Sequence, residues 1–146
     1  MTFGSVDELL EAAREGLTRL TPDEAAEAVA SGDLIVDIRP EWQRRELGEI
    51  PGSLVVERNH LEWRLHPHSD ARLPQADTRR RWIIVCTEGY TSSLAAHSLR
   101  SLGLDAADVI GGIVAWREAG LPVVPGPTAI EQIVADPAIH QQSVAG

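Results

Sequence analysis

Short apolar runs alternate along the chain with segments in which apolar residues recur every three or four positions. The runs at 34–38, 54–56 and 82–86 are continuous and rich in aliphatic residues, a pattern typical of strands buried on both faces. Because such strands alternate with helical patterns, we expect a three-layer α/β/α sandwich around a mainly parallel central sheet. The expected strands are 18–20, 34–38, 54–56, 82–86 and 107–110, and the expected helices are 5–16, 21–32, 40–47, 59–65, 92–102 and 114–119.

Local signals support two of these helices. Asp7 and Glu8 lie in the first turn of the first helix, where the helix dipole favours acids. Thr21-Pro22-Asp23-Glu24 combines an N-cap, a proline at the first helical position and a capping-box acid. The apolar positions that share a face are Val6, Leu9, Leu10 and Ala13 in the first helix, and Leu94, Ala95, Leu99 and Leu102 in the helix at 92–102.

The length of 146 residues fits one domain. Residues 66–80 are polar and contain two prolines, which predicts a loop. We expect 1–17 to be an N-terminal helical extension, 18–124 the main domain, and 125–146 a C-terminal tail with one helical turn around 130–134.

Composition narrows the function. A net charge of −9 argues against binding to nucleic acid or to an anionic membrane surface. All 13 basic residues are arginine, which removes lysine Schiff-base chemistry and suits a ligand that carries an oxyanion. A single cysteine cannot form an internal disulfide or a Cys-rich zinc site. No apolar run approaches the roughly 20 residues of a membrane span, and the N-terminus lacks the pattern of a secretory signal, so a cytoplasmic location is expected.

Cys86 is the last residue of the strongest predicted strand. Ligands of open parallel sheets bind beyond the carboxyl ends of the strands. A tight turn from Cys86 into the next helix would direct backbone N–H groups and the positive helix end at the sulfur, which stabilises a thiolate, a persulfide anion or a bound oxyanion. Gly89 permits the positive φ of such a loop, and Thr91, Ser92 and Ser93 are expected to cap the helix and donate hydroxyl hydrogen bonds. The alternative is a buried free cysteine that only packs.

Three motifs surround this cysteine in order. They are Asp37-x-Arg39 with Gly48-x-Ile50-Pro51-Gly52-Ser53, then Val85-Cys86-x-x-Gly89-x-Thr91-Ser92-Ser93, and last Gly111-Gly112-x-x-Ala115-Trp116 with Gly120-Leu-Pro122. Over 18–124 the chain therefore resembles single-domain rhodanese-like (thiosulfate sulfurtransferase-like) proteins. The resemblance implies a rhodanese-like sandwich, no cofactor, and a Cys86 that accepts a sulfane sulfur as a persulfide and passes it to a thiol or another nucleophile. It also implies a cradle for sulfur and substrate made by Thr87, Glu88, Gly89, Tyr90, Thr91 and Ser92.

The sequence departs from the family pattern in and near this loop. Many relatives place a basic residue within the loop, whereas this one has none and carries Glu88, whose carboxylate would oppose both a thiolate and the approach of thiosulfate. Glu49 stands where the family has a histidine, and we interpret it as a surface change without catalytic meaning. Phosphatases with a similar anion cradle need an arginine six residues after the cysteine. That position is Ser92, which argues against phosphate-ester chemistry.

Two arginines are expected at the same edge of the sheet. Arg39 either lines the pocket or, as the preferred interpretation, forms an ion pair with Asp37 or a nearby acid. Arg58 is the best candidate for the missing positive charge, with a plain salt bridge to Glu57 or Glu62 as an equal alternative.

The remaining candidates are interpreted as structural. His60 could shuttle a proton but is assigned to the surface, and His66-Pro-His68 lacks matching partners for a metal. The tryptophans expected to line the core or the pocket are Trp63, Trp82 and Trp116.

Two functions remain open at this stage. The leading hypothesis is a sulfurtransferase whose partners are a small sulfur-donor anion or persulfide and a thiol acceptor, which could be a protein. The alternative is a non-catalytic rhodanese module that binds a partner protein or senses redox state. The acidic loop motivates this alternative, and it also suggests that thiosulfate is not the natural donor.

Overall fold

A computed structural model of the protein describes residues 2–77 and 79–128. At its centre is a five-stranded sheet in the order β1-β5-β4-β2-β3, in which every neighbouring pair is parallel. The expected parallel α/β sheet is confirmed. The strands are β1 (Arg19–Leu20), β2 (Leu34–Asp37), β3 (Leu54–Val55), β4 (Trp82–Val85) and β5 (Ala106–Val109).

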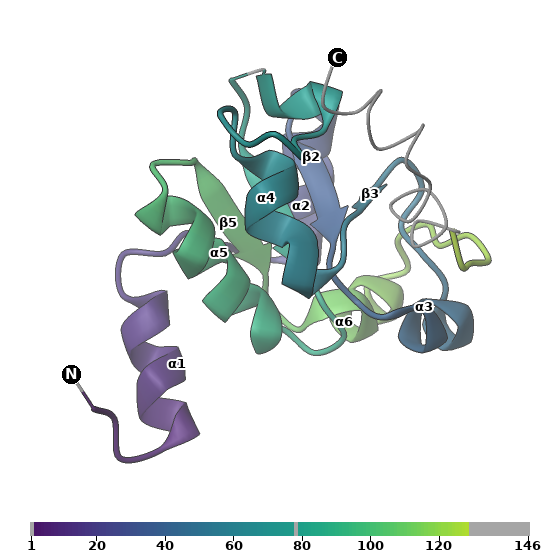
Figure 1. Cartoon of the computed structure of the whole chain (residues 1–146). Coiled ribbons are helices and arrows are strands. Elements are labelled where there is room, and N and C mark those ends of the chain that lie inside the picture. The colour runs from purple at the N-terminus through teal and green to yellow at the C-terminus, as the bar shows by residue number, and fades with distance from the viewer. Residues whose placement is uncertain (1, 78, 129–146) are drawn as a thin grey trace.

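Helices cover both faces of this sheet, as the three-layer expectation requires. In Figure 1, α4 (Leu61–Leu65) and α5 (Thr91–Ser101) lie in front of the sheet and α2 (Pro22–Ala30) lies behind it. The first helix, α1 (Val6–Arg14), packs against α5. The other helical segments are α3 (Glu41–Leu47), α6 (Gly112–Glu118) and the short 3-10 turns η1 (Arg58–His60) and η2 (Pro74–Asp77).

The central strand β4 explains why a continuous apolar run marks the middle of the sheet. Its side chains alternate between two hydrophobic clusters, with Ile84 packed toward α4 and α5, and Ile83 and Val85 packed toward α2 and α6. Each such buried side chain stabilises the fold by roughly 1.5–3 kcal/mol. Because β4 lies between β5 and β2, the residue after it, Cys86, is at the middle of the carboxyl edge.

Two local predictions have direct outcomes. Thr21 caps α2 as expected: its hydroxyl accepts from the Glu24 N–H at 3.2 Å, and the Glu24 carboxylate accepts from the Thr21 N–H at 2.9 Å. The segment 66–80, which was expected to be a loop, contains the short 3-10 turn η2. The helical turn expected around 130–134 lies outside the described residues. Among the helices of the described part, none is long and apolar enough to cross a membrane.

The prediction that Trp63 lines the core or the pocket at Cys86 is wrong, because 62% of this residue is exposed and it is not part of that pocket wall. Helix α4 buries Leu61, Arg64 and Leu65, which lie three and four positions apart, and this spacing turns Trp63 toward solvent. The tryptophans at 82 and 116 are buried as expected.

The apolar faces of α1 and α5 are also narrower than their sequences indicate. Val6 is 72% exposed, and the buried residue of α1 is Ala13. Leu102 is exposed because it follows the last turn of α5 as its C-cap. Helix α1 therefore touches the domain near its C-terminal end, the end that carries Arg14.

Candidate active site

Cys86 lies at the start of a tight loop that joins β4 to α5. Its sulfur accepts hydrogen bonds from the backbone N–H groups of Gly89 at 3.2 Å and Ser92 at 3.3 Å. The residue is 7% exposed, so the thiol is reached from one side only. Two amides directed at one sulfur form a small anion cradle of the kind that stabilises a thiolate or a persulfide. Of the six residues expected to form the cradle, Gly89 and Ser92 thus direct their backbone N–H groups at the sulfur.

Glycines allow the back of this loop to pack against the start of α6. The N–H groups of Ile113 and Val114 donate to the carbonyls of Cys86 and Thr87 at 2.9 and 3.1 Å. Gly112 has a φ of +59°, and a Cβ placed there would lie 2.4 Å from the Cys86 carbonyl oxygen. The third sequence motif is thus a packing requirement of the cysteine loop.

A pocket of about 320 Å³ opens in front of the sulfur. Its wall combines loop residues with side chains from the carboxyl ends of β2 and β3, which meet here because the strands are parallel. The expected site residues at this pocket are Arg39, Arg58, Cys86, Thr87, Glu88, Tyr90 and Thr91. The pocket is large enough for a small sulfur donor, and Gly89, Ser92 and Asp37 are the expected site residues that are not part of its wall.

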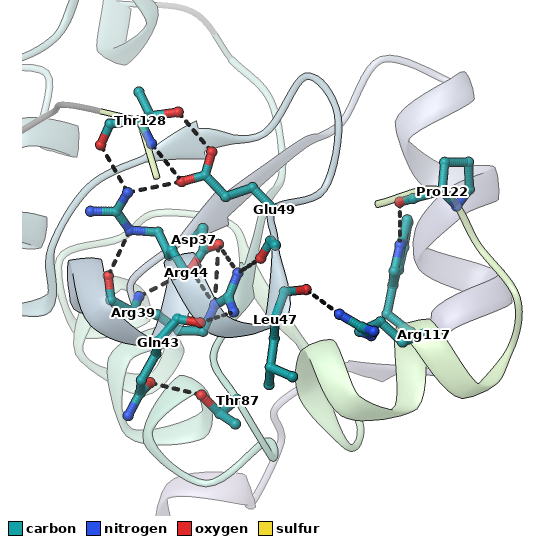
Figure 2. A network of polar contacts seen from close by, with 12 residues as sticks. Asp37, Arg39, Gln43, Arg44, Leu47, Glu49, Thr87, Arg117, Pro122 and Thr128 are labelled. Atoms are coloured by element: carbon teal, nitrogen blue, oxygen red, sulfur yellow. Dashed lines mark hydrogen bonds and ion pairs between the residues drawn. The ribbon is translucent and has the colours of Figure 1, made fainter. Parts of the chain in front are cut away.

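The guanidinium of Arg39 forms an ion pair with Asp37 inside the fold, which was the preferred interpretation of the sequence. It donates to both carboxylate oxygens of Asp37 and, at 2.6 Å, to the carbonyl of Gly48 (Figure 2). Both side chains of the ion pair are fully buried. Arg39 contributes to the pocket wall, while its charge is paired with Asp37. A further hydrogen bond at 2.7 Å joins Gln43 of α3 to the Thr87 hydroxyl and ties the loop to the same region.

Arg58 combines the two roles that the sequence left open. It lines the pocket, and its Nη1 donates to both oxygens of Glu62 at 3.0 Å. Burial alone would raise the pKa of Glu62, but the Ser98 hydroxyl and the Arg58 guanidinium outweigh it and hold that pKa below its ordinary value. The charged Glu62 carboxylate neutralises much of the positive charge that Arg58 brings to the pocket.

Behind the loop lies a polar network that the sequence reasoning missed. The Gly89 carbonyl accepts from Arg14 at 2.8 Å and from Arg19 at 3.0 Å. Arg19 also pairs with the fully buried carboxylate of Asp108 on β5. An aspartate inside the apolar run at 107–110 was the available signal, since a buried carboxylate requires partners. Nothing local to Arg14 indicates its contact, because Gly89 lies 75 positions away.

The hydroxyls of Ser92 and Ser93 do not cap α5 as predicted. The N-cap is Tyr90 and its side chain makes no capping hydrogen bond. Instead both serine hydroxyls donate to Asp108 at 2.8 Å. The buried carboxylate attracts these donors more strongly than the exposed helix end does, because it has no access to water.

The interpretation of Glu49 as a surface change is wrong. Glu49 is only 5% exposed and its carboxylate accepts from Arg44 at 2.8 Å and from the N–H and hydroxyl of Thr128 at 3.0 and 2.7 Å (Figure 2). Burial alone would raise the pKa of Glu49, but the hydrogen bonds from Thr128 and Arg44 outweigh it and keep that pKa below the ordinary value. Figure 2 shows this network next to the Arg39 pair, and Arg44 joins the two by donating from Nε to the Arg39 carbonyl at 3.1 Å.

The remaining candidates, His60 and the pair His66 and His68, are not part of the pocket wall. His60 is exposed in η1. Within residues 2–77 and 79–128, no three His, Cys, Asp or Glu side chains come together in a group that could hold a metal ion.

Comparison with solved structures places the fold among known proteins. A protein of unknown function from Rhodopseudomonas palustris, described as a possible tyrosine phosphatase, is 32% identical, with a TM-score of 0.77 over 85% of this chain and 98% of that one. Thiosulfate sulfurtransferase from Pseudomonas aeruginosa shares the fold at 24% identity, with a TM-score of 0.67 over 82% of this chain and 22% of that one.

A curated relative and a family model match the same part of the chain. The adenylyltransferase and sulfurtransferase UBA4 of Yarrowia lipolytica is 28% identical over 100 residues, which is 68% of this chain but only 24% of that protein. The model of the rhodanese-like domain matches residues 21–119, from the N-cap of α2 to the end of α6. This range includes the cysteine loop, the strands that position it and the glycines behind it, and the chain belongs to the rhodanese-like domain family.

Proposed function

We propose that the protein is a sulfurtransferase in which Cys86 carries a sulfane sulfur as a persulfide. The observation that carries the proposal is the pair of loop amides 3.2 and 3.3 Å from the sulfur of Cys86, a residue that lines the pocket. A cysteine that only packs in a core has no need of two amide donors and an open pocket. The sulfurtransferase named among the relatives agrees with this chemistry.

The proposed reaction consists of two displacements that balance without an oxidant. The Cys86 thiolate attacks the transferable sulfur of the donor, and the electron pair of the broken bond leaves with the remainder. In thiosulfate or a persulfide the broken bond is S–S and the remainder is sulfite or a thiolate. In a mercaptopyruvate-type donor the broken bond is C–S and the remainder leaves as an enolate, which then takes up a proton. An acceptor thiolate then attacks the terminal sulfur of the persulfide, and the electron pair of the broken S–S bond returns to Cys86. The amides of Gly89 and Ser92 stabilise the anionic sulfur before and after each step.

The charges around the pocket favour donors less anionic than thiosulfate. Glu88 is exposed on the pocket wall, and the positive charge of Arg58 is largely offset by Glu62. At the pocket wall a dianion therefore gains little electrostatic attraction and meets one opposing carboxylate. We propose a low-molecular-weight persulfide or a mercaptopyruvate-type donor, with a thiol as the acceptor.

Phosphatase chemistry, suggested by the description of the Rhodopseudomonas relative, fits this loop less well. An arginine that holds a phosphate would be expected at position 92. The residue there is serine, and its hydroxyl is turned inward to Asp108.

A non-catalytic module that binds a partner is the second candidate, and the acidic pocket wall at Glu88 favours it.

Intact-mass measurement after incubation with each donor class tests the proposal. We expect a gain of about 32 Da, one sulfur atom, that a thiol reductant reverses and that Cys86→Ser abolishes. Ser101→Ala serves as the control and should gain the same mass as the wild type, since Ser101 is exposed at the end of α5 and its hydroxyl donates to the His97 carbonyl on the same helix. If thiosulfate, a mercaptopyruvate-type donor and a low-molecular-weight persulfide all leave the mass unchanged, the sulfurtransferase is excluded and the binding module is favoured.

A further inference from the structure

The carbonyl of Gly89 is held by two arginines from outside the loop. Arg14, the last residue of α1, donates to it from Nη2, and Arg19 of β1 donates to it from its own Nη2. Both arginines precede residues 21–119, the range matched by the family model. Arg19 lies on the edge strand of the central sheet and Arg14 on the helix before it, so the contact joins the cysteine loop to the N-terminal part of the chain.

The direction of this carbonyl determines the direction of the next amide. A trans peptide is planar, so its C=O and N–H groups point to opposite sides. With the Gly89 oxygen turned to the arginines, the N–H of Tyr90 points away from them. The same restraint keeps the preceding part of the loop in place, including the Gly89 N–H that donates to the Cys86 sulfur.

The two arginines are themselves fixed by buried groups. Arg19 donates to both oxygens of Asp108, and Arg14 donates through Nε to the Ser93 hydroxyl at 3.0 Å. That hydroxyl in turn donates to Asp108 at 2.8 Å. The Asp108 carboxylate neutralises one of the two positive charges of Arg14 and Arg19. These three side chains together therefore bring a net positive charge to the back of the loop.

We infer that Arg14 and Arg19 are positioning residues for the Cys86 loop: they hold the Gly89 carbonyl away from the sulfur and supply, from behind, the positive charge that the loop sequence lacks. The inference rests on the proposed function for its biological meaning. Its physical content, a loop that attracts anions to Cys86 because of Arg14, can be measured without any sulfur transfer. Because Cys86 is the only cysteine of the chain, alkylation reports on this thiol alone.

The test compares alkylation of Cys86 by anionic iodoacetate and by neutral iodoacetamide at pH 7. The measured quantity is the rate constant for iodoacetate divided by that for iodoacetamide. Arg14→Met should lower this ratio by about threefold to tenfold, as loss of one nearby charge predicts. Arg14→Lys keeps the charge and should stay within about twofold of the wild-type ratio. Arg14→Gln keeps a donor for the carbonyl but loses the charge, so its ratio should fall like that of Arg14→Met, and it replaces that variant if Arg14→Met does not fold.

Arg100→Met is the matched control, because Arg100 is exposed on α5 near Gly16, two residues after the end of α1, and within the described residues it forms no hydrogen bond or ion pair with the cysteine loop. Its ratio should equal that of the wild type. A ratio that stays at the wild-type value in both Arg14→Met and Arg14→Gln, or that falls equally in Arg100→Met, overturns the inference. If no donor forms a persulfide on the wild-type chain, the proposed function fails, while the alkylation ratios still decide the role of Arg14.

Discussion

Glu88 places a carboxylate at the pocket through which any donor reaches Cys86. Its side chain is exposed, so its effect on a charged donor acts through water and is weakened by salt. We expect Glu88→Gln to raise kcat/KM for thiosulfate by about twofold to fivefold at low ionic strength, and Glu88→Arg to raise it further. Steady-state kinetics at two salt concentrations checks this. An uncharged donor provides the control, since its kcat/KM should not change; a value for thiosulfate that is unchanged or lower shows that the carboxylate is not limiting.

Individual residues also show where sequence reasoning reaches its limit. The Asp37 and Arg39 pair was predicted, because an acid and a base two positions apart at the end of a buried strand must satisfy each other. The bond from Arg14 to Gly89 could not be predicted in the same way. It depends on how α1 packs on α5, and an arginine in the last turn of a helix is equally suited to solvent.

At the scale of elements, the joint between the cysteine loop and α6 is the most constrained part of the site. Gly112 combines a φ of +59° with a predicted Cβ contact of 2.4 Å to the Cys86 carbonyl oxygen. We expect Gly112→Ala to lower the free energy of unfolding by about 3 kcal/mol or more, since backbone strain and an atomic overlap act together. Urea denaturation measures the change, and alkylation of Cys86 should slow as the loop shifts.

Gly120→Ala separates the two causes of that destabilisation. Gly120 has a similar φ of +76°, but a Cβ there meets no atom within 4 Å. Its substitution should therefore cost only the left-handed backbone conformation, about 1–2 kcal/mol. Equal losses for the two variants would show that the close approach to the Cys86 carbonyl has no energetic consequence.

The order of elements could be predicted because each strand carries its own signal. The run at 82–85 is apolar at every position, and burial on both faces of the sheet requires that. The exposed faces of α1 and α4 could not be predicted, because helical spacing shows which residues share a face but not how much of that face is covered. Trp63 is the clearest case, since its partners on α4 pack inward and it does not.

At the scale of the whole molecule, Glu49 connects segments that are far apart in the chain. Its carboxylate joins Arg44 on α3 to Thr128, and the Glu49 N–H and carbonyl pair with Val124 at 2.8 Å each. The segment after α6 is thus attached to the β2–β3 side of the domain. A glutamate in a turn between Gly48 and Ile50 carries no local sign of this role, because its partner Thr128 lies 79 positions later.

The ionisation of Glu49 should make this attachment dependent on pH. Because the pKa of Glu49 in the folded protein lies below its ordinary value of 4.5, the ionised carboxylate stabilises the fold above that pH, and the contribution is lost as pH falls through the lower folded value. Glu49→Gln should lower the free energy of unfolding by about 1–3 kcal/mol at pH 7, since the buried Arg44 guanidinium loses its ion pair with the Glu49 carboxylate. The difference from wild type should shrink steadily below pH 4.5.

Urea denaturation of both proteins between pH 3 and pH 7 measures this dependence. The control is Glu41→Gln, which removes the carboxylate of the exposed pair that Glu41 forms with Arg45 on the same helix. Exposed pairs of this kind contribute about 0.3–0.5 kcal/mol, so Glu41→Gln should leave the stability curve almost unchanged at every pH. A loss in Glu49→Gln that is the same at pH 3 and pH 7 would mean that the carboxylate acts through its shape and hydrogen bonds alone. A pH-dependent loss would instead establish that the buried charge on Glu49 attaches the segment after α6 to the rhodanese-like domain.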